Sequence, residues 1–444
     1  MTSPHRFSGN PSSGNSTSRG RSSRSRVSRR DLLRYGVAGA SIAALGPFGR
    51  GLLPHASGAP LTNHKRVVVI YCYGGYDGLN LLVPITNQAY YDRRPTIQIA
   101  DTDTLALSDS VDYGWHPNFT RMAGLYNDTD VAAFHKVGYP SANLSHFTSQ
   151  DIYSWGVRGE FAPLGIPESG WIARYADLFA QTPLGAAALG IGRPLDFEGG
   201  STNPFMATSL QNFDFNAAGL NADEETHRKN AAGAILDAFP GAGEAENDAG
   251  TALGQGQDLA QQVQAAVASY SSSFANAYPT TSPGAFLRDA AIMIQAGFET
   301  EVFFTGFSGW DTHTNQGAGA GVQANLVTRL DEAIGVFSDD LKEMGVWDDT
   351  LILIASEFGR RNFENSSQGT DHGHGNTFVA IGGGVNGGLY GVGPSESDIA
   401  DNNWLDYGID FRDIYREAIT NHLGEDASAI FPEAQDINNT LGYV

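Results

Sequence analysis

Short apolar runs separated by helical patterns organise the chain from residue 66 onward. Continuous runs of this kind are typical of strands buried on both faces of a sheet, and they occupy residues 66–73, 130–137, 186–191, 300–307, 351–355 and 377–381. Apolar residues at helical spacing mark residues 148–155, 171–179, 258–270, 285–296 and 325–343. We expect residues 66–73 to form a central parallel strand, in an α/β fold of the size that one domain often reaches.

Polar side chains appear repeatedly where these runs end. Asp77 follows the first run, Asp311 and His313 follow residues 300–307, and Glu357 and Arg360 follow residues 351–355. Open α/β sheets bind ligands outside the carboxyl ends of their strands, and carboxylates and imidazoles are ordinary ligands of zinc or manganese. The economical interpretation is one shared cleft. The structural alternatives are a turn-forming Asp77 and an Asp-turn at Asp311 beside a surface histidine.

A glycine-rich loop precedes the last apolar run and carries Asp371, His372 and His374. Glycines let the backbone come close to an ion or a substrate, so the loop is a candidate source of further ligands. The alternative is a solvated loop that holds two histidines.

Ser145 lies just before a predicted helix. Free N–H groups and the helix dipole favour an anion such as phosphate or sulfate at that place. A serine there is also the most ordinary N-cap, and the residues alone favour the capping interpretation.

The first 59 residues have the pattern of a twin-arginine export signal. A Ser/Gly/Arg-rich stretch, which cannot pack a core, precedes Arg29 and Arg30, a weakly apolar segment and small residues up to Ala59. We expect cleavage near Ala59 and a periplasmic or extracellular location. An uncleaved anchor is the alternative, although Pro47 and Arg50 make the segment a poor membrane span. The mature chain, residues 60–444, is expected to be a single domain with an insertion or lid near residues 195–250.

The charge changes when this leader is removed. The whole chain carries −22, and the leader holds nine arginines and one acid, so the mature chain carries −30. Such a surface repels nucleic acid and anionic lipid, which argues against both as partners. Cys72 is the only cysteine, so no intrachain disulfide is expected, and its place in an apolar strand favours an inert core thiol.

The motifs in their order resemble a known family. After the twin-arginine leader come GGYDGLN at residues 74–80, SHF at 145–147, GWDTH at 309–313, SEFGR at 356–360 and GTDHGHG at 369–375. This series resembles the exported bacterial family called domain of unknown function 1501, over nearly all of the mature chain. That family is similar to the alkaline phosphatase and sulfatase superfamily, which implies a three-layer α/β sandwich with a large, mostly parallel central sheet.

The resemblance also implies roles for individual residues. It implies Ser145 as candidate nucleophile, with Ser141 or Thr148 as alternatives, and Arg360 as a group that holds substrate oxygens. The implied metal ligands are Asp77, Asp311, His313, Glu357, Asp371, His372 and His374. The cofactor would be one or two divalent ions: zinc, manganese or calcium. Phe358 is a departure, because the superfamily has a histidine there, and the position of Cys72 excludes a formylglycine mechanism.

Two functions are therefore expected to compete. The first is an exported metal-dependent hydrolase that acts on a small-molecule or glycan ester of phosphate or sulfate. The second is a non-catalytic exported protein of the same fold that binds a partner or a surface glycan. Retention of the Asp and His residues favours the first function, and Phe358 favours the second.

Overall fold

A computed structural model describes residues 58–158, 169–180, 182–213, 223–224, 226–227, 244–431 and 440–444. The predicted export signal therefore lies outside the described residues, apart from its last two positions. Within the described chain, no helix is long and apolar enough to cross a bilayer.

A nine-stranded sheet forms the centre of the described chain, in the order β11-β5-β10-β9-β1-β8-β6-β7, with β12 paired to β5. The strands are β1 (Arg66–Tyr73), β5 (Val131–Gly138), β6 (Ala186–Leu189), β7 (Phe205–Ala207), β8 (Val302–Ser308), β9 (Thr350–Ala355), β10 (Asn376–Ile381), β11 (Gly388–Tyr390) and β12 (Ile409–Asp410). Every predicted apolar run is one of these strands. The sequence interpretation of strands is thereby confirmed.

Strand β1 is central, as predicted, and pairs in parallel with β8 and β9. The sheet is mostly parallel, but β10 runs antiparallel to both β9 and β5. The loop that precedes β10 therefore lies at the sheet edge where β1, β5, β8 and β9 end. Residues from four separate parts of the chain meet at that edge.

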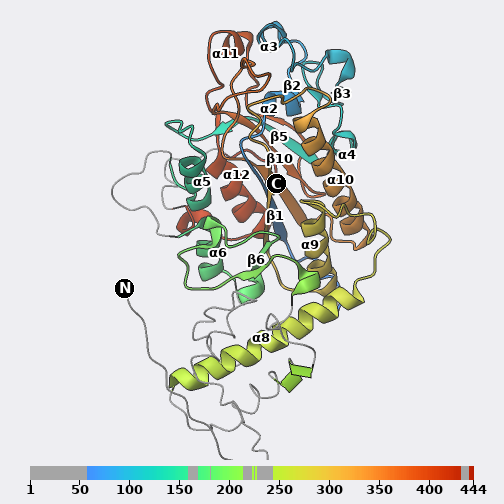
Figure 1. Ribbon diagram of the computed structural model, residues 1–444, viewed down its shortest axis with the longest axis vertical. Helices are drawn as coiled ribbons and strands as arrows, with labels where there is room; N and C mark the ends of the chain where they lie inside the picture. Colours follow the sequence, from blue (N-terminus) through green and yellow to red (C-terminus); the bar gives the residue numbers. More distant parts are fainter. Residues whose placement is uncertain are drawn as a thin grey trace, which may run out of the picture.

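Two hydrophobic cores cover the two faces of the sheet. Alternate residues of β1 point to opposite faces: Val68, Ile70 and Cys72 enter one core and their neighbours enter the other. The first core packs against α4 (Thr120–Asn127), α9 (Gly284–Ala296) and α10 (Val322–Glu343), and the second against α5 (His146–Trp155), α6 (Trp171–Leu178) and α12 (Phe411–Glu417). These helices lie on opposite sides of the sheet in Figure 1. The fold is a three-layer α/β sandwich, as predicted.

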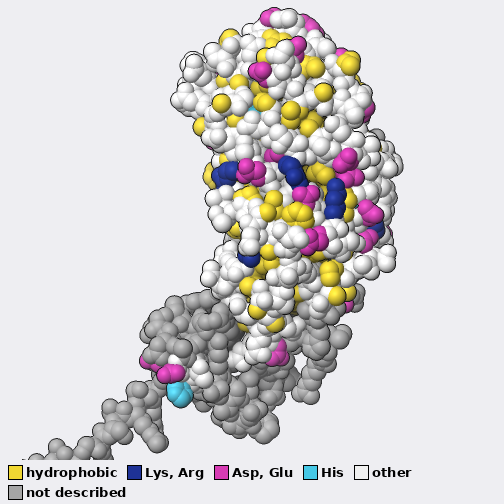
Figure 2. Space-filling view, turned by 90° about the vertical axis from the view of Figure 1, so that its right-hand side faces the viewer, with side chains coloured by type: hydrophobic (Ala, Val, Ile, Leu, Met, Phe, Trp, Pro, Cys, Tyr) yellow, Lys and Arg dark blue, Asp and Glu magenta, His cyan; other side chains and the backbone are white. Residues whose placement is uncertain are grey.

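Helix α10 shows why the sequence folds in this way. Its residues Leu326, Leu330, Ile334, Phe337 and Leu341 are buried at three- and four-residue spacing, which places them on one helical stripe. The outer surface of this side carries acidic and basic side chains beside one another (Figure 2). Two ion pairs, Arg121 with Asp339 and Lys342 with Asp130, belong to this side of the sandwich.

Smaller elements surround the sandwich. The strands β2 (Leu82–Val83), β3 (Leu105–Ala106) and β4 (Gly114–Trp115) form a separate sheet. The short helices are α2 (Gly78–Leu81), α3 (Gln88–Arg93) and α11 (Glu396–Ala400), and α8 (Glu244–Ser269) is a long one. Within the predicted insertion near residues 195–250, β7 is an edge strand of the main sheet, and most of residues 214–243 lie outside the described chain.

Candidate metal centre

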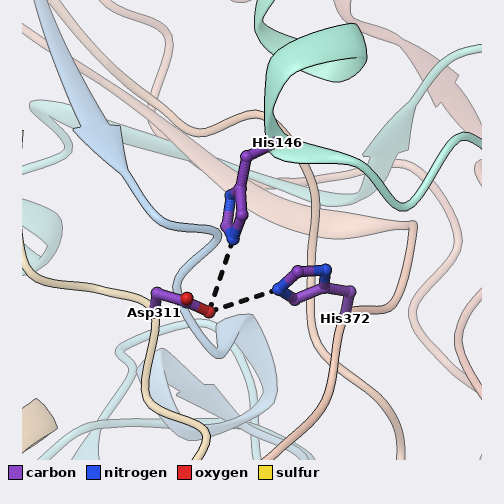
Figure 3. A group of neighbouring side chains, drawn as sticks. All are labelled: His146, Asp311 and His372. Atoms are coloured by element: carbon purple, nitrogen blue, oxygen red, sulfur yellow. Dashed lines mark hydrogen bonds and ion pairs between the residues drawn. The ribbon is translucent and has the colours of Figure 1, made fainter.

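Three loops at the carboxyl edge of the sheet bring four side chains together. His146 is the first residue of α5, which follows β5. Asp311 and His313 follow β8, and His372 lies in the loop before β10. One ligand atom each from His146, Asp311 and His372 lies within 4.8 Å of the others, and the two imidazoles point toward the carboxylate in Figure 3.

One oxygen, Oδ1 of Asp311, lies at the centre of this cluster. Nε2 of His146 is 3.4 Å from it, Nε2 of His313 is 3.0 Å and Nε2 of His372 is 3.2 Å. The Asp311 and His313 side chains are 46% and 41% exposed, whereas His146 and His372 are 24% and 21% exposed. The cluster is thus anchored on one side and open to solvent on the other.

Each imidazole is held through its other nitrogen. Nδ1 of His146 lies 2.7 Å from Oε1 of Glu357, and Nδ1 of His313 lies 3.2 Å from Oδ1 of Asp371. Nδ1 of His372 lies 2.7 Å from the carbonyl oxygen of Leu144. Carbonyl and carboxylate oxygens accept hydrogen bonds, so each Nδ1 carries the hydrogen. In the neutral rings every Nε2 then presents a lone pair to the cluster.

The lone pairs provide a test of whether a cation fits. Nε2 of His313 and Nε2 of His372 are only 2.9 Å apart, and both face the Asp311 carboxylate. Nε2 of His146 is a buried nitrogen without a hydrogen-bond partner. Without a proton or a metal ion between them, these electron pairs repel one another. The donor set and its orientation therefore fit a metal ion, and the hydrogen-bonded outer partners are those usual for metal-ligating histidines.

Glu357 lies behind His146 and supports it. The carboxylate is fully buried and accepts from Gln150 Nε2 at 3.0 Å and from the Gly74 amide at 2.9 Å, besides His146. Burial works to raise the pKa of Glu357, but the hydrogen bonds from His146, Gln150 and the backbone outweigh it and lower that pKa. The same hydrogen bond to Glu357, ahead of opposing burial, raises the pKa of His146.

Arg360 is a buried anchor for Asp311. Its Nη2 donates to Asp311 Oδ1 at 2.6 Å, and other guanidinium donors bind the carbonyl oxygens of Gly75 at 2.5 Å and Thr370 at 2.8 Å. Burial works to raise the pKa of Asp311, yet the hydrogen bond and charge of Arg360, with smaller contributions from His313 and His146, lower it. Asp311 is thereby held ionised at the centre of the cluster.

The structure places Asp77 elsewhere. Its carboxylate is 1% exposed and pairs with Arg94 Nη1 at 2.5 Å, while Gln316 Nε2 donates to it at 2.7 Å. Within the described chain, the group of metal-ligating side chains does not include Asp77.

His374 also lies apart from the cluster. It is 2% exposed, its ring packs against Tyr139 and Tyr407, and burial lowers its pKa to about 4. Asp371 is linked to the cluster through His313, whose Nδ1 lies beside Asp371 Oδ1. Nη1 of Arg361 lies 3.8 Å from Asp371 Oδ2.

Phe358 closes the buried side of the cluster. Its ring lies 4.8 Å from the His146 ring and 4.7 Å from the His372 ring, measured between centroids. Gly75 permits this packing, because a Cβ at residue 75 would lie 2.4 Å from the Phe358 ring. The φ of Gly75 is +67°, a backbone conformation that favours glycine. Phe358 thus occupies the space beside both imidazoles.

Ser145 is the N-cap residue of α5, but its side chain makes no capping hydrogen bond. It is exposed and directly precedes His146. The sequence interpretation singled out Ser145 and passed over His146 as a ligand. The signal was available: His146 follows a strand that ends at the same sheet edge as the strand before Asp311.

The fold and the cluster define a class: three-layer α/β proteins with a histidine and aspartate site at the carboxyl edge of a mostly parallel sheet. Solved structures to which the chain is similar include a protein of the alkaline phosphatase superfamily from Vibrio parahaemolyticus, with 13% identity and a TM-score of 0.31, over 82% of this chain and 71% of that one. The alkaline phosphatase of the Antarctic bacterium TAB5 has 9% identity and a TM-score of 0.30, over 83% of this chain and 100% of that one. The PsFucS1 sulfatase of Pseudoalteromonas sp. has 14% identity and a TM-score of 0.34, over 82% of this chain and 68% of that one.

The family model for "Protein of unknown function (DUF1501)" matches residues 169–441. The chain belongs to this family, which agrees with the resemblance seen in its motifs. No curated protein matches the chain in sequence. The similarity to the solved structures is too low to transfer an activity or a residue role.

Proposed function

We propose that the protein is an exported metal-dependent hydrolase of phosphate or sulfate esters. The observation that carries the proposal is the convergence of three imidazole Nε2 atoms on Asp311 Oδ1, with every Nδ1 already engaged. Such preoriented nitrogens are what a metal ligand set requires. Their place at the carboxyl edge of the sheet is where α/β proteins bind substrates.

The donor set favours a zinc-class ion. His146, Asp311 and His372 would hold it, and His313 Nε2 lies close enough to two of them to serve as a fourth donor. Imidazole nitrogen suits zinc, whereas calcium prefers sites made of oxygen atoms. A bound ion would lower the pKa of a nearby hydroxyl or water and stabilise negative charge on the ester.

Ser145 is the candidate nucleophile. Its hydroxyl makes no capping hydrogen bond, and the residue directly precedes His146 at the N-terminus of α5. The first amides of a helix lack intrahelical partners and favour an anion. Ser141 and Thr148, on either side, remain the alternative hydroxyl groups. Arg360 acts in this proposal by fixing the orientation of Asp311.

The test combines metal content with turnover. Asp311→Ala should lose metal and ester hydrolysis together, while Ser145→Ala should keep the metal and lose hydrolysis. Asp348→Ala is the matched control, because this exposed aspartate precedes β9 at the opposite end of the strand. Plasma mass spectrometry and chromogenic esters provide the two readouts. Equal metal content in the Asp311→Ala and Asp348→Ala proteins would refute the site.

The second candidate function is a non-catalytic binding protein of the same fold. The observation that favours it is the Asp77–Arg94 pair, with a 2.5 Å contact between side chains that are almost fully buried. The family resemblance implies Asp77 as a metal ligand, but in this pair its carboxylate binds Arg94 instead. Phe358 lies where the resemblance implies a histidine. A protein that binds stoichiometric metal but hydrolyses no phosphate or sulfate ester would support this function.

Export rests on the leader sequence. Fusion of residues 1–59 to a folded reporter should direct it out of the cytoplasm, and replacement of both Arg29 and Arg30 by lysine should retain it inside. Export of the double variant at the unchanged level would refute the twin-arginine assignment.

A further inference from the structure

We infer that the centre is built to bind ester groups with a single negative charge, such as sulfate monoesters and phosphodiesters, in preference to doubly charged phosphate monoesters. The inference rests on the proposed cation site and narrows its substrate class. It follows from the number of cations that the cluster can hold and from the charges fixed around it.

The described side chains provide ligands for one ion. His146, Asp311 and His372 form the group of metal-ligating atoms found among the described residues. Two buried carboxylates of the same region, Asp77 and Glu357, are engaged by other groups. Asp77 pairs with Arg94, and Glu357 accepts hydrogen bonds from His146, Gln150 and Gly74.

The fixed charges around the cluster nearly cancel. The carboxylates are Asp311 itself, Glu357 on His146 and Asp371 on His313. The guanidinium groups are Arg360, at 2.6 Å from Asp311, and Arg361, at 3.8 Å from Asp371. With neutral imidazoles these groups leave a net charge of −1. One divalent ion changes the net charge to +1.

A local charge of +1 is balanced by one negative charge. A dianion would leave an excess charge of −1 near the fixed carboxylates of Asp311 and Asp371. Complementarity of charge sets specificity because juxtaposed like charges are costly. The open side of the cluster also suits a diester, which carries two organic substituents: the Asp311 and His313 side chains are 46% and 41% exposed, and the neighbouring Phe147 is 83% exposed.

Methyl sulfate and methyl phosphate provide matched probes, since they have similar size and differ in charge at pH 8. Isothermal titration of the zinc-loaded protein should show tighter binding of methyl sulfate and of dimethyl phosphate than of methyl phosphate. Tighter binding of methyl phosphate, or no measurable binding of the two monoanions, would overturn the inference.

Two substitutions of opposite sign test the cause. Asp371→Asn keeps an oxygen for His313 and Asn365 while it removes a negative charge, and Arg361→Gln removes a positive charge beside it. The preference for monoanion over dianion should fall roughly fivefold in Asp371→Asn and rise by a similar factor in Arg361→Gln, as expected for one unit charge near a partly exposed site. Asp348→Asn is the control and should leave the preference unchanged. Identical preferences in all three variants would show that the fixed charges do not set it.

Turnover separates this inference from the proposed function. Hydrolysis of 4-nitrophenyl sulfate, bis(4-nitrophenyl) phosphate and 4-nitrophenyl phosphate is measured on the same zinc-loaded protein. Monoanion binding without hydrolysis of any ester would support the charge argument and overturn the hydrolase. Hydrolysis with a preference for 4-nitrophenyl phosphate in both binding and kcat/KM would support the hydrolase and overturn the charge argument.

Discussion

Replacement of Glu357 separates its support of His146 from its role in packing. The carboxylate accepts hydrogen bonds from His146, Gln150 and the Gly74 amide on one oxygen and from Ser356 on the other, and it is fully buried. In Glu357→Gln, the amide oxygen keeps the first three bonds. The new amide group faces Ser356 Oγ. The single hydroxyl hydrogen of Ser356 then stays with the Cys72 carbonyl, and the hydroxyl oxygen accepts from the amide group.

The expected magnitudes differ between two variants. Glu357→Gln should change the free energy of unfolding of the metal-free protein by less than about 1 kcal/mol, because its hydrogen bonds persist. Loss of the carboxylate that orients and polarises His146 should weaken metal binding by about 10- to 100-fold. Glu357→Ala leaves the buried Gly74 amide without a hydrogen-bond acceptor, which costs about 1–3 kcal/mol. The Glu357→Ala protein should therefore lose both stability and metal affinity.

The assay is a competition titration of zinc against a chromophoric chelator, beside thermal unfolding of the metal-free proteins. Gln150→Ala is a useful control, since it removes one hydrogen-bond donor of Glu357 but keeps the carboxylate that holds His146. Zinc affinity of Glu357→Gln within twofold of the unsubstituted protein would refute the reasoning and remove His146 from the ligand set.

Three further outcomes are expected. Burial raises the pKa of Asp196 to about 6, so the folded state binds the Asp196 proton more tightly than the unfolded state and loses stability as pH rises from about 4 through 6. Asp196→Asn should therefore stabilise the protein by up to about 3 kcal/mol at pH 8 and change its stability little at pH 4. Equal shifts of the chemical denaturation midpoint at both pH values would contradict this. Asp77→Ala should destabilise the fold by about 3–5 kcal/mol because Arg94 is left buried without its charge partner. Undiminished zinc stoichiometry in this variant would show that Asp77 is not a ligand. Loss of zinc from a folded variant would show that Asp77 is a ligand. Gly75→Ala should lower both stability and zinc affinity, since its Cβ would be 2.4 Å from the Phe358 ring, and a melting temperature equal to the unsubstituted protein would be inconsistent with that packing.

The sequence predicted the main strands because β1, β8 and β9 are covered on both faces, so that each is a continuous apolar run. It did not reveal that β10 is antiparallel, because a buried run reads alike in both directions. The two-residue strands of the small sheet were also missed, since so short a segment has no measurable periodicity. Strand direction in this chain is set by packing between distant segments.

The sequence also pointed to part of the candidate site, because some of its residues adjoin apolar runs. Asp311, His313 and His372 could be found because they follow or precede apolar runs. The pairing of Asp77 with Arg94 depends on how the loop after α3 folds back, and no local pattern encodes it. Glu357 was recognised as part of the site, but its place behind His146 became visible only in three dimensions.

The position of β10 has a consequence for the order in which the molecule is assembled. This strand comes late in the chain but lies between β5 and β9 and pairs with both. Until residues 376–381 leave the ribosome, β5 has no link to β9 and His372 has no fixed position. A nascent chain that ends before this segment can pair β9, β1, β8, β6 and β7, whereas the partners of β5 among the described strands, β10, β11 and β12, are still missing. The candidate metal centre, which needs His146 after β5 and Asp311 after β8, forms only when β10 joins these two parts.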